Sequence, residues 1–234
     1  VVQGNVPELG LGFNDERRRI TRNNAEVTVA LADDVAGGRA TQPDLVVWPE
    51  NSVDVNPYAD AQTRAEVSRA VDAIGAPTLI GALVPTPDGR NIENTSIVWE
   101  PGRGAGQAYV KRHPMPFGEY IPFRSIARRI TSAVDQQPRD FVAGDDVGLL
   151  EMGPSDIGAV ICFEVAFDNL VRDAVRAGAD LLAVQTNNAT FGGSAQPEQQ
   201  FAISRLRAIE SGLPVVVAAT SGISGVILPS GAVV

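Results

Sequence analysis

The sequence contains very few of the residues that support disulfide bridges, histidine catalysis or nucleic-acid binding. Cysteine, histidine and lysine occur once each, as Cys162, His113 and Lys111, and the other 18 basic residues are arginine. A single cysteine excludes an internal disulfide. The net charge of −9 argues against a nucleic-acid partner, which usually meets a basic face. The longest apolar runs, at 45–48 and 215–219, are far shorter than the roughly 18 residues of a membrane span.

What remains is the composition of a globular protein. The hydrophobic fraction is 44% and the mean hydropathy is +0.01, which excludes general disorder. The 23 glycines and 16 prolines follow no period, so a collagen-like or low-complexity chain is excluded too. A length of 234 residues suits one large domain or two small ones.

Continuous apolar runs alternate with amphipathic stretches along the whole chain. Helices are predicted at 14–36, 60–75, 167–177 and 197–211, and strands at 44–49, 77–84, 92–99, 107–111, 157–162, 180–185 and 214–220, with a final hairpin from 223. This alternation predicts an α/β protein whose sheets are covered by helices. In such proteins the functional groups gather where strands end.

Three chemically distinct side chains follow predicted strands: Glu50, Lys111 and Cys162. Each has a simpler interpretation by itself. The cysteine can be a small apolar core residue, the glutamate a cap of the next element, and the lysine a solvated charge. Together they provide a nucleophile, a base and a cation, which indicates a possible cysteine acyl-transfer enzyme.

A cysteine attacks a carbonyl carbon as its thiolate, so it needs a base and a positive neighbour. The usual base is histidine, and His113 is the single candidate. A partly desolvated carboxylate can take that role, and an ammonium group can stabilise both the thiolate and the oxyanion. Asn94, close to the start of a predicted strand, is expected to bond a loop backbone.

The sequences around these three residues resemble the signature blocks of the nitrilase superfamily. The blocks are WPEN at 48–51, KRHPMPFGE at 111–119 and ICFE at 161–164. More narrowly, PFGEYIP at 116–122, NNATFG at 187–192 and RAIE at 207–210 look like the bacterial apolipoprotein N-acyltransferases. The resemblance covers essentially the whole chain.

The resemblance implies an α-β-β-α sandwich and a single nitrilase-like catalytic domain over residues 1–234. It implies that Glu50 is the general base, Lys111 the oxyanion-stabilising group, Cys162 the nucleophile and Glu119 a second glutamate beside the lysine. No metal or organic cofactor is implied. The residues expected to bind substrate or support the site are Glu164, Phe117, Tyr120, Phe163 and Asn188.

The activity that the resemblance implies is transfer of a fatty acyl chain. A phospholipid is the expected donor, the chain passes through a thioester on the cysteine, and the N-terminal amine of a diacylglyceryl-cysteine apolipoprotein accepts it. The implied location is the bacterial inner membrane, with the catalytic domain on its extracytoplasmic face. Because the chain opens at Val1 and closes just after a turn, we expect it to be a segment of a longer membrane protein. The block at 187–192 lacks the acidic and the large aromatic residue usual in that family. The family's substrate contacts at this loop therefore do not carry over to this chain, whereas the triad is unaffected.

Two other functions remain open at this point. One is a soluble carbon–nitrogen hydrolase that cleaves a small amide with the same triad, and the other is a catalytically silent domain that binds lipid or a partner. A membrane-surface contact is predicted for the aromatic loop at 117–123 with Arg124, Arg128 and Arg129, because apolar rings enter an interface and arginine meets lipid phosphate. An ordinary solvated charged face is the alternative.

Overall fold

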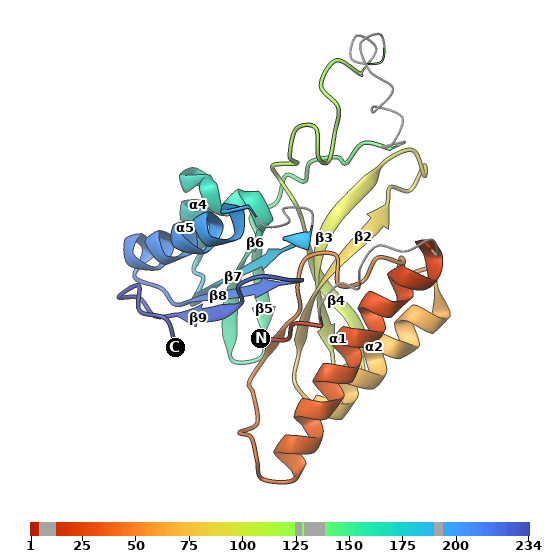
Figure 1. Cartoon of the computed structure of the whole chain (residues 1–234), viewed down its shortest axis with the longest axis vertical. Helices are drawn as coiled ribbons and strands as arrows, with labels where there is room; N and C mark the ends of the chain where they lie inside the picture. The colour runs from red at the N-terminus through yellow and green to blue at the C-terminus, as the bar shows by residue number, and fades with distance from the viewer. Residues whose placement is uncertain (5–12, 125–127, 129–138, 190–193) are drawn as a thin grey trace.

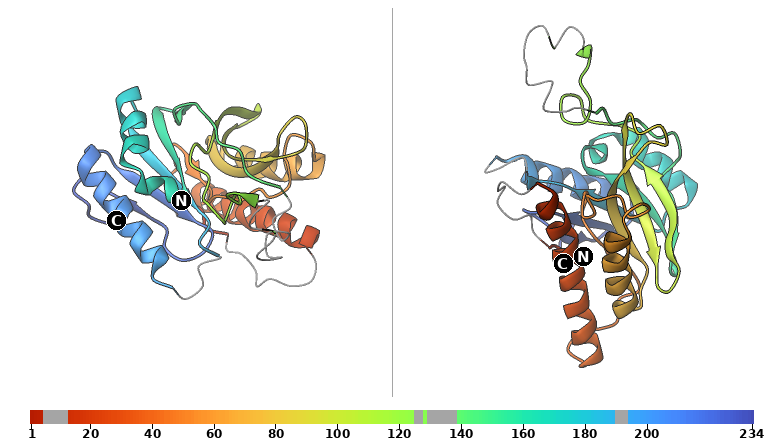
Figure 2. Two further views of the ribbon diagram at one scale, coloured as in Figure 1. Left: turned by 90° about the horizontal axis from the view of Figure 1, so that it is seen from above. Right: turned by 90° about the vertical axis from the view of Figure 1, so that its right-hand side faces the viewer.

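The computed structural model describes residues 1–4, 13–124, 128, 139–189 and 194–234, and the side chains of the first helix from residue 18 onward. Two β-sheets pack face to face, and a pair of helices covers the outer face of each (Figure 1). The view from above places the two helix pairs on opposite sides of the sheets (Figure 2, left). This arrangement is the α-β-β-α sandwich that the sequence predicts.

The first sheet has four strands in the order β1-β2-β3-β4. Its strands are β1 (Val46–Val47), β2 (Thr78–Pro85), β3 (Ile92–Glu100) and β4 (Gly104–Val110), and the helices beside it are α1 (Phe13–Ala36) and α2 (Ala61–Ile74). The first two strands are parallel, and β3 is antiparallel to both β2 and β4. Consequently β1 and β4 run in the same direction, and their C-terminal ends lie at the same end of the sheet.

The second sheet has five strands in the order β5-β6-β7-β8-β9. Its strands are β5 (Leu149–Met152), β6 (Ser155–Ile161), β7 (Leu181–Thr186), β8 (Val215–Ala219) and β9 (Gly225–Ile227), and the helices are η2 (a 3₁₀ helix, Cys162–Ala166), α4 (Asp168–Ala177) and α5 (Gln196–Ser211). The three central strands are parallel, whereas β5 and β9 pair antiparallel at the two edges.

Each sheet is covered on both faces because the side chains that alternate along its strands are apolar on both faces. In β1, Val46 packs toward the helices and Val47 toward the other sheet. In β6, Val160 faces the helices of the second sheet and Ile161 faces the first sheet. Because successive side chains of a strand point to opposite faces, continuous apolar strands of this kind require cover on both sides.

Local signals fix several of the element boundaries. The Asp60 carboxylate accepts a hydrogen bond from the Thr63 backbone N–H at 2.7 Å, and Gly75 ends α2 in the left-handed region, so both predicted caps are confirmed. Two features were not predicted. One is the short strand β5, and the other is the separate turn of 3₁₀ helix η2, whereas α4 spans the predicted helix at 167–177 to within one residue.

The segment that follows β4 leaves the sheets and projects from one end of the molecule (Figure 1). The parts of it that the structure describes include residues 113–124 and 139–144. Of the helices described, none is both long and apolar enough to cross a membrane.

Candidate active site

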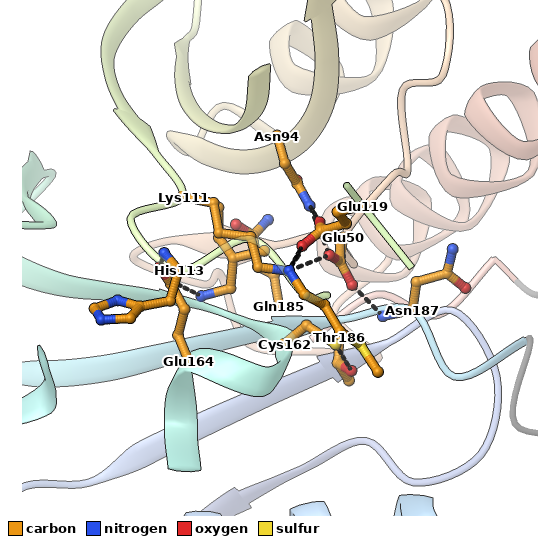
Figure 3. A network of polar contacts seen from close by, with 12 residues as sticks. Glu50, Asn94, Lys111, His113, Glu119, Cys162, Glu164, Gln185, Thr186 and Asn187 are labelled. Carbon is orange, nitrogen blue, oxygen red and sulfur yellow. Dashed lines mark hydrogen bonds and ion pairs between the residues drawn. The ribbon is translucent and has the colours of Figure 1, made fainter. Parts of the chain in front are cut away.

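Strand direction brings the three predicted residues together. Glu50 follows β1 and Lys111 follows β4, and the C-terminal ends of these two strands lie at the same end of the first sheet. Cys162 follows β6 in the facing sheet. The three side chains therefore meet between the two sheets, and Figure 3 shows the lysine extending across the gap toward the cysteine.

A buried network of charges links the two glutamates through the lysine. The Lys111 Nζ lies 3.4 Å from Glu50 Oε1 and 2.9 Å from the Glu119 carboxylate. The Asn94 amide donates to both carboxylates, at 2.8 Å each. Glu50 and Lys111 are only 4% and 2% exposed. Asn94 thus holds two like charges at fixed positions around one ammonium group, whereas the sequence predicts a hydrogen bond to a loop backbone.

Two further contacts orient the Glu50 carboxylate. Its second oxygen accepts the Asn187 backbone N–H at 2.7 Å, from the loop after β7. The Gln185 side-chain amide in β7 donates to the Trp48 carbonyl at 2.7 Å. Both hydrogen bonds cross from the second sheet to the segment that carries Glu50, so they set the position of this carboxylate relative to the cysteine.

The surroundings keep Lys111 protonated. Burial lowers the pKa of the ammonium group, but the negative charges of Glu50 and Glu119, together with that of Cys162 when it is a thiolate, outweigh it, so the pKa lies above its ordinary value. A permanently charged ammonium in a desolvated site is well suited to stabilise an oxyanion, because electrostatic interactions there are weakly screened.

Cys162 occupies a strained backbone position at the end of β6. Its φ is 55°, a left-handed value that non-glycine residues rarely adopt. The thiol is 6% exposed. Burial, followed by the charge of Glu50, raises the pKa of the thiol to about 11, against the opposing effects of Lys111, Thr186 and Gln200. In the free protein at neutral pH the thiol is therefore protonated, and its reaction needs a base.

Glu164 is fully buried and joins the cysteine segment to the lysine segment. Its carboxylate accepts the backbone N–H of Ile161 at 2.8 Å, of Arg112 at 2.7 Å and of His113 at 3.1 Å, and the Tyr109 hydroxyl at 2.9 Å. Burial raises the pKa of this carboxyl, and the two backbone donors at Ile161 and His113 oppose that rise. These contacts agree with the supporting role that the resemblance implies for Glu164.

Of the remaining predicted residues, Phe163 and Asn188 lie beside the site, and Phe117 and Tyr120 lie in the loop that carries Glu119. Phe163 and Cys162 both line a pocket of about 160 Å³, whose other walls come from Met115, Val165, Ala166, Gln196, Gln199, Gln200 and Ile203. Asn188 is buried, and its Oδ1 lies 3.0 Å from the Thr186 hydroxyl. Tyr120 accepts the Phe117 N–H through its carbonyl at 2.7 Å, which closes the loop that carries Phe117.

His113 does not act as the base of a cysteine–histidine pair. Its ring stacks on Phe167 with ring centres 4.5 Å apart, and its backbone N–H bonds Glu164. Two residues that contact the sulfur, Thr186 and Gln200, were missed, because neither stands in a recognisable motif. Nothing in the described part of the chain groups three or more His, Cys, Asp or Glu side chains as a metal site. Residues 190–192 of the divergent block lie outside the described residues.

Comparison with known proteins identifies the family. The model of the carbon–nitrogen hydrolase family matches residues 13–234, nearly the whole chain. The chain belongs to the carbon–nitrogen hydrolase family. Solved structures of this superfamily share the fold: a protein from Saccharomyces cerevisiae has a TM-score of 0.67 at 17% identity over 92% of this chain and 79% of that one. An amidase from Nesterenkonia has a TM-score of 0.62 at 18% identity over 99% and 82% of the two chains.

Within this carbon–nitrogen hydrolase family, the chain is similar to apolipoprotein N-acyltransferases. The protein of that name from Mycolicibacterium smegmatis is 46% identical over 234 residues, which are 98% of this chain and 39% of that protein. The one from Rhizobium meliloti is 31% identical over 100% of this chain and 44% of its own length. The chain thus spans about two fifths of the length of these relatives.

Proposed function

We propose that this chain is the catalytic domain of an apolipoprotein N-acyltransferase, which moves an acyl chain from a phospholipid to the N-terminal amine of a diacylated apolipoprotein. The observation that carries the proposal is the buried Glu50–Lys111–Cys162 cluster, in a chain 46% identical over 98% of its length to a protein of that name. The whole of 1–234 serves as one catalytic domain in this proposal. Its place is the extracytoplasmic face of the bacterial inner membrane.

The first half-reaction forms a thioester. Glu50 takes the proton of the Cys162 thiol while the sulfur bonds to the carbonyl carbon of the phospholipid ester. The carbonyl oxygen becomes an oxyanion beside the Lys111 ammonium group. When the tetrahedral intermediate collapses, the carbon–oxygen ester bond breaks, and the lysophospholipid leaves with the proton that Glu50 held.

The second half-reaction uses the same groups in the same places. The free amine of the apolipoprotein attacks the thioester carbon, and Glu50 takes a proton from the nitrogen. The carbon–sulfur bond breaks as the amide forms, and the sulfur is reprotonated from Glu50. Glu119 and Asn94 touch the lysine and the base, so they position both groups throughout the cycle.

Exposed apolar side chains beside the site support a lipid substrate over a small water-soluble amide. Phe117 and Phe123 are 73% and 80% exposed, on the projecting segment that also carries Glu119. Exposed rings at such a site are suited to a membrane interface. Arg124 forms an ion pair with Asp140 within the chain, and Arg128 is exposed. Arg129 lies outside the described residues.

The deciding experiment follows the acyl group. The full gene product is incubated with phosphatidylethanolamine vesicles, and intact-protein and peptide mass spectrometry then search for an acyl adduct on Cys162. A diacylglyceryl-cysteine peptide added next should remove the adduct and appear as its N-acyl amide. Hydrolysis of small amides without any adduct from phospholipid would instead support the soluble hydrolase.

The exposed rings should control access to lipid and leave the chemistry intact. Replacing Phe117 and Phe123 together with serine should lower the rate of adduct formation from vesicles by about a hundredfold or more, since each ring buried in the interface contributes about 1.5–3 kcal/mol and every 1.4 kcal/mol is about a factor of ten. Alkylation of Cys162 by iodoacetamide should change by less than about twofold, because no contact of the thiol is altered.

A matched control is Tyr58→Ser. Tyr58 is an exposed aromatic outside the segment that carries Phe117 and Phe123, and it lines a separate pocket with Arg64 and Trp99. This change should leave both rates unaltered. If the double serine variant loses alkylation and lipid reaction in equal measure, the loop is holding the site in shape and the membrane-access prediction is wrong.

A further inference from the structure

Two uncharged side chains of the second sheet contact the sulfur of Cys162. The Thr186 hydroxyl, at the end of β7, lies 3.4 Å from Sγ. The side-chain Nε2 of Gln200, on α5, lies 3.6 Å from Sγ, within the range of hydrogen bonds to sulfur. The same Thr186 hydroxyl lies 2.8 Å from Gln200 Oε1, so the two side chains also bond each other.

The hydroxyl of Thr186 has more acceptors than protons. It carries one proton, and it lies within reach of Sγ, of Gln200 Oε1 and of Asn188 Oδ1, the last at 3.0 Å. Only one of these acceptors takes the proton at a time. A thiolate is a charged acceptor and attracts it most strongly, whereas a thiol or a thioester sulfur is a weak acceptor. The direction of this hydroxyl therefore depends on the state of the sulfur.

We propose that Gln200 and Thr186 form a hydrogen-bonding pair that stabilises the Cys162 thiolate. When the sulfur is neutral, the Thr186 proton points to Gln200 Oε1 and fixes the amide so that its N–H faces the sulfur. When the thiolate forms, the hydroxyl rotates to donate to it, and the sulfur then has two donors. The inference rests on Cys162 as the nucleophile of the proposed function, although it is tested without any acyl transfer.

The charges around the sulfur leave a need for such donors. The Glu50 carboxylate opposes the thiolate and the Lys111 ammonium favours it. Glu119 is engaged by that lysine, and Glu164 points at backbone N–H groups. A thiolate that is desolvated and faces a carboxylate is costly unless neutral donors contact it, and each hydrogen bond to a charged group contributes about 1.5–3 kcal/mol.

The pair would serve both half-reactions. In the first, the sulfur transfers its proton to Glu50 and must bear negative charge as it attacks. In the second, the carbon–sulfur bond breaks and the sulfur again carries the charge as a leaving group. In the thioester between them, the Thr186 hydroxyl returns to Gln200, which keeps the amide in place for the second step.

The test measures thiol ionisation directly. Cys162 is the single cysteine, so alkylation by iodoacetamide reports on this thiol alone. In the full gene product, Gln200→Met retains the length of the side chain and removes the donor. It should raise the apparent pKa of alkylation by about one unit, a tenfold loss of thiolate at any pH below it. Gln200→Glu should raise it further, because a second carboxylate then faces the sulfur.

The matched control is Gln199→Met. Gln199 is an exposed neighbour on the same helix that lines the same pocket and has no hydrogen bond to the sulfur. It should leave the pH profile unchanged, and circular dichroism should give equal thermal midpoints for the 199 and 200 variants. An unshifted profile in Gln200→Met would overturn the proposal, as would a loss of rate that persists above the apparent pKa, where the thiolate is fully formed in both proteins. A shift in alkylation with no adduct from phospholipid would uphold the pair and refute the acyltransferase.

Discussion

Replacement of Cys162 with alanine should abolish both thioester formation and acyl transfer. The sulfur is the atom that bonds to the acyl carbon, and no neighbouring side chain at the end of β6 can replace it as a nucleophile. The remaining rate should equal that without protein. Adduct formation from labelled phospholipid and transfer to a diacylated peptide are the two measurements.

The same change should cost little stability. Alanine tolerates the left-handed backbone of position 162 no better and no worse than cysteine, and Thr186 and Gln200 still bond each other. Losing one buried sulfur should lower the free energy of unfolding by about 1 kcal/mol, and the thermal midpoint by about 2–4 °C for a chain of this size. An acyl adduct that persists after Cys162→Ala would show that another residue is the nucleophile.

Replacement of Lys111 with arginine should reduce adduct formation by about 10²–10³-fold, the loss typical for one oxyanion-stabilising donor. The charge is conserved, but the Nζ atom sits within 2.9–3.4 Å of two carboxylates in a site where the lysine is 2% exposed. A planar guanidinium is larger and cannot place a point charge there without moving Glu50 or Glu119. The measurement is the single-turnover rate of adduct formation.

The control is the opposite substitution, arginine to lysine, at the neighbouring position 112. Arg112→Lys alters a partly exposed side chain that pairs with Asp173 at 3.1 Å, while the backbone N–H that bonds Glu164 is kept. Its rate should stay within about twofold of the parent, as surface ion pairs contribute little. A Lys111→Arg variant that retains near-normal turnover would mean that Lys111 is not part of the chemistry.

Much of the fold is predictable because its signals are local. Continuous apolar strands predict sheets covered by helices, the family resemblance implies the two-sheet sandwich, and Asp60 and Gly75 mark the ends of α2 through their own side-chain and backbone chemistry. The meeting of Glu50, Lys111 and Cys162 is predictable from their positions after strands and from the motifs around them. Their catalytic roles remain predictions, since geometry alone does not report a rate.

Other parts of the site depend on contacts between residues that are far apart in the sequence. The Asn94 amide reaches Glu50 across 44 residues of chain, and Gln200 reaches Cys162 across 38. Asparagine and glutamine at these positions look like ordinary polar residues of a strand and a helix. Only the packing of the two sheets decides which of them face the reacting atoms, so sequence reasoning had no signal for either.

The cross-sheet hydrogen bonds of Gln185 and of the Asn187 backbone have a consequence for how this protein tolerates change. Neither sheet holds a complete site: the base and the cation belong to one, and the nucleophile to the other. Core residues such as Leu79 and Val98 that fill the space between the sheets set the distance over which protons and acyl groups move. A methyl group gained or lost there changes the distance between the two sheets, and with it the distance between the base, the cation and the nucleophile. Selection for activity therefore extends into a layer of apolar residues that never meet the substrate.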